Sequence, residues 1–323
     1  NPAPTASSSL PRASRVVVPL PALALAITAT WGFNFVVIKV GTDGVPPLLL
    51  AALRFAFVSV PAVLFVRRPR ASWLLVAAYG LFLGVGEFGL LFTAIKLGAP
   101  SGLSSLILQA QAFFTALLAA LFLRERFSLH SALGMLIAAC GLGVIGWQGN
   151  QPGAWGGHFA AALAMLIGAA LMWAVANILA KQIGDVGALN LIVWSSLAAP
   201  LPLLALSLWF EGAAAISASL TSLSWLSVGA IAYLVVLSTL FGYAAWNHLI
   251  VLHGAGRVAP FSMLVPIFGV TAGAACLGEA FTAYHAFAAL LVIVGLAVHT
   301  FGSSRSGAPV TMLGTWKEGI QAL

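Results

Sequence analysis

The stretch WGFNFVVIK at residues 31–39 decides the fold, because WAVANILAK at residues 173–181 repeats it. Both stretches begin with Trp and end with Lys, at an offset of 142 residues. In the later part of each half the offset is 154, which aligns Tyr79 with Tyr233. The difference predicts about twelve additional residues in the second half, near Glu211. The chain therefore consists of two related halves.

Both halves are overwhelmingly apolar. Of the 323 residues, 61% are hydrophobic and only 7% are charged, and the mean hydropathy is +1.06. A soluble domain carries about 25% charged residues, so this composition argues against a soluble enzyme, a nucleic-acid-binding protein and a disordered chain. A membrane-spanning helix takes about 20 apolar residues, and the apolar total suffices for about ten such helices.

We predict that the apolar runs cross the membrane as helices, because backbone groups in lipid must be hydrogen-bonded internally and long unbroken runs do not suit a barrel. The ten predicted spans cover residues 20–39, 46–66, 72–96, 101–123, 129–147, 157–181, 187–209, 223–251, 257–277 and 282–301. Each half holds five spans, and an odd number makes the halves cross in opposite directions. The predicted fold class is an all-α integral membrane protein of ten transmembrane helices, arranged as two inverted-topology five-helix repeats.

The distribution of Lys and Arg predicts the orientation of these spans. With the N-terminus in the cytoplasm, eleven of the fourteen basic residues fall on the cytoplasmic side, two fall on the opposite side, and Arg54 lies within a span. Such an excess is typical of cytoplasmic loops. We therefore expect a cytoplasmic N-terminal tail at 1–18, five-helix repeats at 19–150 and 151–302, and a cytoplasmic C-terminal tail at 303–323.

Arg54 and Glu87 are ionisable residues deep inside predicted spans, roughly 12 and 15 Å from the outer end at 1.5 Å per residue. Charged groups inside a membrane usually face a partner or a cavity. One interpretation is an Arg54–Glu87 ion pair with a structural or coupling role. The alternative is that Glu87 faces a cavity and binds a substrate ammonium group or a proton. The surrounding GVGEFG at 84–89 favours close helix approach or a local irregularity.

Aromatic and amide side chains, most of them paired between the two halves, are the other candidates for a binding site. Aromatic rings contact apolar side chains and cations, and amides both donate and accept hydrogen bonds. Repeat-built transporters place substrate near the midplane, although helix packing is the alternative role for any single aromatic residue. The candidate substrate-binding residues are Trp31, Asn34, Tyr79, Glu87, Trp173, Asn177, Tyr233 and Tyr243.

The sequence carries no pattern for enzymatic or metal chemistry. Its six His and two Cys residues lack the spacing of a metal site. Paired carboxylates, a nucleophile with its base, and a Gly-rich phosphate-binding motif with its Lys are not found either. We therefore expect no catalytic residues, no metal, no cofactor and no ATP-driven step.

Several short motifs, in their order and repetition, resemble the drug/metabolite transporter superfamily, in particular proteins with two EamA-type domains. The motifs are WGFN at 31–34 with Lys39, LRF at 53–55, LRE at 123–125 followed by Gly134 and Gly141, and Pro266 with LGE at 277–279. The resemblance covers about residues 20–301 and implies that each five-helix half is EamA-like. One departure is Ala112, which stands in the first half where the second has Pro266.

Ten spans, an inverted repeat and this resemblance together predict a secondary transporter. The resemblance implies an exporter of small metabolites in the bacterial inner membrane. Its substrates are expected to be amino acids, including aromatic or hydrophobic ones, and to cross by alternating access through a central cavity. The expected partners are a small-molecule substrate and the lipid bilayer, without nucleic acid and with the oligomeric state open. A passive channel or facilitator for small solutes is the alternative, and a lipid-handling membrane protein has less support.

Overall fold

The structure is a computed structural model that describes residues 20–125, 128–149 and 154–304. The predicted tail at 1–18 and nearly all of that at 303–323 lie outside these ranges. Several basic residues that count toward the predicted orientation, Arg126 among them, lie outside as well. Within the described ranges every regular element is a helix, which confirms the all-α class.

The first half contains four long helical segments and one shorter helix. In chain order its elements are α1 (Leu20–Gly44), α2 (Pro47–Ala62), α3 (Trp73–Gly80), the π-helix η1 (Leu81–Phe88), α4 (Gly89–Lys96), α5 (Ser101–Ile107), α6 (Ala110–Phe122) and α7 (Leu129–Gly149). Elements α3, η1 and α4 form one continuous helix, and α5 with α6 forms another.

The second half has a similar order of long helical segments, with α11 and several short helical turns in addition. In chain order its elements are η2 (Ala154–Gly157), α8 (Phe159–Ile183), α9 (Ala188–Ser195), η3 (Ser196–Ala198), α10 (Pro200–Phe210), α11 (Ala213–Thr221), α12 (Trp225–Ala232), the π-helix η4 (Tyr233–Phe241), α13 (Gly242–His253), α14 (Ala255–Val258), η5 (Ala259–Leu264), α15 (Val265–Leu277) and α16 (Ala283–Ser304). Helix α11 follows Glu211 directly, where the change in repeat offset predicts additional residues.

Eight helices in the described part of the chain are long and apolar enough to cross a membrane, and a ninth is counted if α9 and α10 form one span. These two helices meet at a 43° bend, where Pro200 starts α10 and cannot continue the helical hydrogen bonding. Helix α2 has only 16 residues and carries Pro61 next to its end. The protein is therefore a multi-pass helical membrane protein, while ten crossings stay a prediction.

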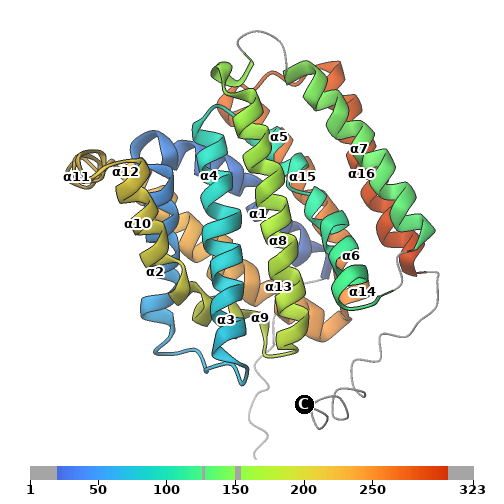
Figure 1. Ribbon diagram of the computed structural model, residues 1–323, viewed down its shortest axis with the longest axis horizontal. Helices are drawn as coiled ribbons and strands as arrows, with labels where there is room; N and C mark the ends of the chain where they lie inside the picture. The colour runs from blue at the N-terminus through green and yellow to red at the C-terminus, as the bar shows by residue number, and fades with distance from the viewer. Residues whose placement is uncertain (1–19, 126–127, 150–153, 305–323) are drawn as a thin grey trace, which may run out of the picture.

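Helices α7 and α16 lie side by side at one edge of the bundle, whereas α11 projects at the opposite edge (Figure 1). Gly134 and Gly295 form the contact between α7 and α16, since a Cβ atom on either glycine would meet the carbonyl oxygen of the other. Small residues let membrane helices approach closely where lipid gives no hydrophobic drive for association. Gly134 belongs to the motif that follows LRE, so that motif serves helix packing.

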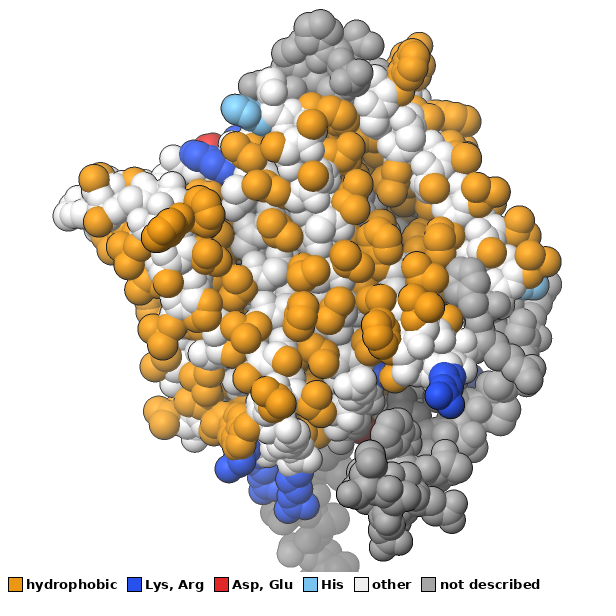
Figure 2. Space-filling view, viewed as in Figure 1, with side chains coloured by type: hydrophobic (Ala, Val, Ile, Leu, Met, Phe, Trp, Pro, Cys, Tyr) orange, Lys and Arg blue, Asp and Glu red, His pale blue; other side chains and the backbone are white. Residues whose placement is uncertain are grey.

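The outer surface of the molecule is apolar where the long helices run. Figure 2 shows hydrophobic side chains across the middle of one face and charged side chains near the helix ends. Large exposed apolar residues in water would need another protein to cover them, but lipid chains cover them in a membrane. The surface thus agrees with the composition.

Candidate functional site

Two π-helical segments interrupt long helices at corresponding places in the two halves. Segment η1 covers Leu81–Phe88 and η4 covers Tyr233–Phe241, so they overlap when the 154-residue offset is applied. In η4, Thr239 Oγ1 donates to the Leu234 carbonyl five residues earlier at 2.8 Å. π-Helical turns are rare and occur frequently at functional sites. The irregularity predicted at residues 84–89 is confirmed by η1.

Close helix approach also occurs at η1, as the glycines there predict. A Cβ atom on Gly86 would lie 2.7 Å from Met172 Cγ in α8, and one on Gly84 would meet the Ala199 side chain. The same holds for Gly80, whose Cβ atom would meet the Ser195 carbonyl oxygen. These glycines let α8 and the α9–α10 bend pack directly against the helix that carries Glu87.

Arg54 lies in α2 and is only 2% exposed. Its Nε and Nη2 atoms both donate to Thr239 Oγ1 of η4, at 3.2 and 3.0 Å. The guanidinium carbon lies 4.0 Å from the centre of the Phe88 ring of η1, a cation–π distance. Arg54 therefore connects α2 to the π-helical segments of both halves.

Glu87 lies at the end of η1 and is also 2% exposed. It precedes Phe88, whose ring covers the Arg54 guanidinium, and so lies close to Arg54. The ion pairs among the described residues, however, are Lys39–Asp43 and Lys181–Glu125. The direct Arg54–Glu87 pair considered from the sequence is thus not formed in this conformation, in which the guanidinium instead donates to Thr239 and packs on Phe88.

An aromatic group borders these charges. The Trp31 ring of α1 lies 5.9 Å from that of Tyr243 and 5.1 Å from that of Trp246. Trp31 Nε1 donates to the Ser238 carbonyl at 2.9 Å, which places it next to Thr239 in the sequence of η4. Tyr243 lies close to Glu87 and to the buried Tyr79. Half-buried aromatic rings and buried ionisable groups from both halves therefore form one cluster.

Four candidate residues, Tyr233, Asn177, Trp173 and Asn34, form no hydrogen bond or ion pair with Arg54 or Glu87 in the described part of the chain. The Tyr233 hydroxyl donates to the Thr30 carbonyl at 2.9 Å, which packs η4 against α1. Asn177 of α8 donates to Gln111 Oε1 at 2.9 Å and to Thr115 Oγ1 at 3.1 Å, both in α6.

Trp173, one turn before Asn177 in α8, is half-buried and packs against the main core. Asn34 is 6% exposed, and its Oδ1 atom has no hydrogen-bond partner among the described residues. The structure thus joins Trp31, Tyr79, Glu87, Tyr243 and Arg54 in one cluster. It places Asn177 between α8 and α6, with Trp173 one turn earlier on the same face of α8.

Sequence reasoning missed both Thr239 and Trp246. Thr239 is fully buried and its neighbour Ser238 is 2% exposed. Two adjacent hydroxyl residues inside an apolar run of 29 residues were the available signal. Their importance comes from a partner 185 residues away, which a local pattern does not reveal.

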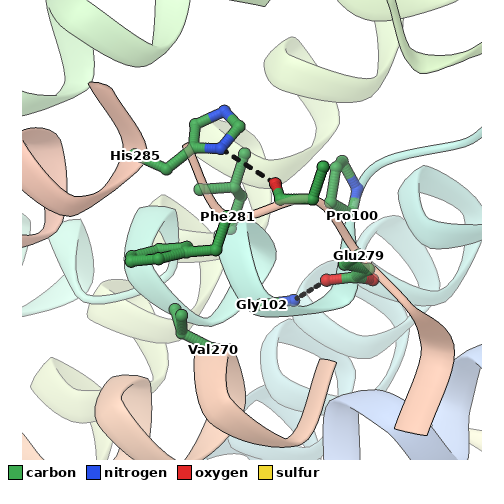
Figure 3. Close-up of a pocket in the computed structure, with 8 residues that line it drawn as sticks. Pro100, Gly102, Val270, Glu279, Phe281 and His285 are labelled. Carbon is green, nitrogen blue, oxygen red and sulfur yellow. Dashed lines mark hydrogen bonds between the residues drawn. The ribbon is translucent and has the colours of Figure 1, made fainter. Parts of the chain in front are cut away.

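Glu279 forms a second polar contact between the halves, at the start of α5 (Figure 3). Its carboxylate accepts from the Ser101 and Gly102 backbone N–H groups, at 2.5 and 2.9 Å. A pocket beside it, lined by Val270, Phe281 and other residues, has a volume of about 20 Å³, which is room for about one water molecule. This pocket is too small for a metabolite, and Glu279 serves as a helix cap.

No group of three or more His, Cys, Asp or Glu residues within the described ranges is arranged to hold a metal ion. Cys140 and Cys276 are both exposed and free. The chemistry that the central cluster offers is therefore recognition by charge, hydrogen bond and ring contact.

Comparison with known proteins agrees with this picture. The profile of the EamA-like transporter family matches residues 20–147 and again 160–301. The chain is 41% identical to a probable amino-acid metabolite efflux pump of Salmonella typhimurium and 38% identical to one of Escherichia coli, in each case over 87% of this chain and 94% of the relative.

A crystal structure aligns with this chain over 90% of this chain and 99% of the other, with a TM-score of 0.59 and 19% sequence identity. At that identity the match shows a likeness of fold alone. The relatives are named as pumps, and no enzyme is among them. Two matched segments that together make up most of the chain settle the family. This multi-pass bacterial membrane protein belongs to the EamA-like transporter family.

Proposed function

We propose that the protein is a secondary transporter that exports amino acids, aromatic and hydrophobic ones among them, across the bacterial inner membrane by alternating access. The observation that carries the proposal is a cluster in an otherwise apolar helical bundle, in which the buried Arg54, Glu87 and Tyr79 lie with the half-buried rings of Trp31 and Tyr243. Charges at such depth are unfavourable unless they serve recognition or pairing. The names of the two efflux pumps support the direction and the substrate class.

The proposed topology has ten crossings in two inverted five-helix repeats, with both termini in the cytoplasm. Contacts between helix ends support it, because they join ends that the topology puts on one side of the membrane. On the outer side Glu211 accepts from the Leu48 backbone N–H at 2.7 Å. On the cytoplasmic side Lys181 pairs with Glu125 at 3.0 Å.

Alternating access requires contacts between the halves to break and form again. Two such contacts meet in η4, where Arg54 donates to Thr239 and Trp31 donates to the Ser238 carbonyl. Since Arg54 and Glu87 are each 2% exposed, substrate reaches them only after helices move. Two π-helices in corresponding segments are suited to such movement, because their hydrogen bonding is irregular.

Purified protein in liposomes tests this proposal. Vesicles preloaded with unlabelled phenylalanine or leucine should accumulate the labelled amino acid by exchange, with a rate that saturates as substrate increases. Vesicles without protein are the control, and a pH gradient of either sign tests proton coupling. Flux that rises linearly with concentration would support a passive facilitator instead, and no flux for any amino acid would contradict the proposal.

The aromatic cluster has its own test within this assay. Replacing Trp31 by Ala removes a ring that contacts both Tyr243 and Trp246, so exchange of phenylalanine should fall at least tenfold. The same change at the exposed Trp209 is the control, because that ring points outward with 83% of it exposed. Equal rates for Trp31→Ala and the wild type would exclude Trp31 from the site.

A further inference from the structure

Three buried polar atoms, two of them in the central cluster and one in α1, have no hydrogen-bond partner within the described part of the chain. They are Arg54 Nη1, Glu87 Oε2 and Asn34 Oδ1. Buried polar groups in proteins are nearly always hydrogen-bonded, and an unpaired buried charge is more unfavourable still. Three such atoms among the sequence-predicted site residues indicate that a ligand completes their bonding.

The two charges are held near each other but kept from pairing. Thr239 Oγ1 accepts from two guanidinium nitrogens of Arg54, which orients the side chain and leaves Nη1 available. The Phe88 ring beneath the guanidinium holds the opposite side. Glu87 precedes Phe88 in η1 and forms no ion pair with Arg54, so each of the two residues keeps a buried polar atom for a ligand to bond.

We propose that Arg54 and Glu87 together recognise the zwitterionic head of an α-amino acid. Arg54 Nη1 donates to the carboxylate, and Glu87 Oε2 accepts from the ammonium group. This inference rests on the proposed function and assigns the two charged groups of its substrate to two residues. One positive and one negative protein charge match a ligand of zero net charge, whereas an amine or a carboxylic acid leaves one buried charge unpaired.

The neighbouring side chains agree with such a ligand. Trp31, Tyr243 and Trp246 form the aromatic border of the charge pair, where the apolar side chain of an amino acid would pack. Asn34 lies three residues after Trp31 and hence on the same face of α1. Its unpartnered Oδ1 is a second acceptor for the ammonium group.

Three compounds with the same phenyl group separate the two charges experimentally. Phenylalanine carries both charged groups, phenethylamine lacks the carboxylate, and 3-phenylpropionate lacks the ammonium group. Each is added as a competitor to exchange of labelled phenylalanine by the protein in liposomes. The wild type should prefer phenylalanine over either analogue at least tenfold, because a site that bonds a polar group rejects ligands without it.

Variants then assign each charge to its group. Glu87→Gln should lose the preference over 3-phenylpropionate and keep that over phenethylamine. Arg54→Gln should lose the preference over phenethylamine and keep that over 3-phenylpropionate. Glu125→Gln is the control, since Glu125 is half-exposed in a pair with Lys181 and should leave all preferences unchanged. The thermal unfolding midpoint of each purified variant shows whether that variant is folded. If a variant does not fold, the competition measured with the wild type still tests whether the site requires both charged groups.

The outcomes distinguish the inference from the proposed function. A wild type that exchanges phenylalanine but is inhibited equally by phenethylamine overturns the zwitterion site and leaves the transporter proposal standing. A Glu87→Gln variant weakened equally toward all three compounds also overturns it, since that pattern indicates a structural role. A wild type that exchanges no amino acid contradicts the proposed function itself.

Discussion

Thr239 is a neutral residue that orients the guanidinium group of Arg54. Its hydroxyl accepts from Arg54 Nε and Nη2 while it donates to the Leu234 carbonyl. The π-helical geometry of η4 supplies that carbonyl at a spacing of five residues. A hydrogen bond to a charged group contributes about 1.5–3 kcal/mol, more than a bond between neutral groups.

Replacing Thr239 by Val should therefore lower the stability of the protein by about 1.5–3 kcal/mol, because it removes the acceptor for the buried guanidinium. The measurement is the thermal unfolding midpoint in detergent. Thr271→Val makes the same chemical change at an exposed hydroxyl that bonds only within α15, at 2.9 Å to the Ile267 carbonyl, and should have a much smaller effect. Equal shifts for the two variants would show that Thr239 does not hold Arg54.

At the scale of elements, carboxylates from elsewhere in the chain bind the starts of two helices. Glu211 accepts from the Leu48 N–H at the start of α2, and Glu279 accepts from the Ser101 N–H at the start of α5. Both helices follow a proline and have unsatisfied N–H groups in their first turn. A carboxylate there forms charge-assisted bonds and complements the helix dipole.

Glu279→Gln should accordingly destabilise the protein by about 1–2 kcal/mol, because the amide carries no charge and has a single acceptor oxygen. Glu125→Gln provides the comparison at the corresponding position of the first half. Glu125 is 52% exposed in its pair with Lys181, and exposed pairs contribute about 0–1 kcal/mol. Unfolding midpoints should fall clearly for Glu279→Gln only, and the opposite ranking would refute the capping role.

The glycines of the helix that carries Glu87 have a packing role that substitution can test. A Cβ atom on Gly80 would meet the backbone carbonyl oxygen of Ser195, which cannot move aside as a flexible side chain can. Gly80→Ala should cost about 1–3 kcal/mol through overpacking. Gly229→Ala in α12 adds the same methyl group where nothing lies within 4 Å, and should not destabilise. Yield and unfolding midpoint of both variants measure the difference.

At the scale of the whole molecule, the proposed topology assigns each loop to one side of the membrane. In a background with Cys140 and Cys276 replaced by Ala, Ser222→Cys should react with an impermeant maleimide in intact cells. Ser72→Cys should react only after permeabilisation, because the adjoining Arg-rich loop is expected to face the cytoplasm. Both positions are exposed, so access to solvent is equal in the folded chain. The reverse pattern would invert the proposed orientation.

The sequence predicts the class of the molecule and several of its local features. Apolar runs, a repeated motif and the order of short motifs lead to an all-helical membrane protein of the EamA-like family, and GVGEFG leads to the irregular helix at η1. These inferences succeed because composition, helix length and glycine content act within one segment. The number of spans does not follow from apolar length alone, since Pro200 bends one predicted span and α2 has only 16 residues.

The meeting of side chains from distant segments is decided by the tertiary structure alone. From the sequence, Arg54 and Glu87 are two charges of compatible depth, for which an ion pair is a reasonable expectation. In the fold, Arg54 donates to Thr239 from the other half and lies over Phe88, and it forms no ion pair with Glu87. Hydrophobicity determines that these helices enter the membrane, whereas the packing between helices determines which polar groups share the interior.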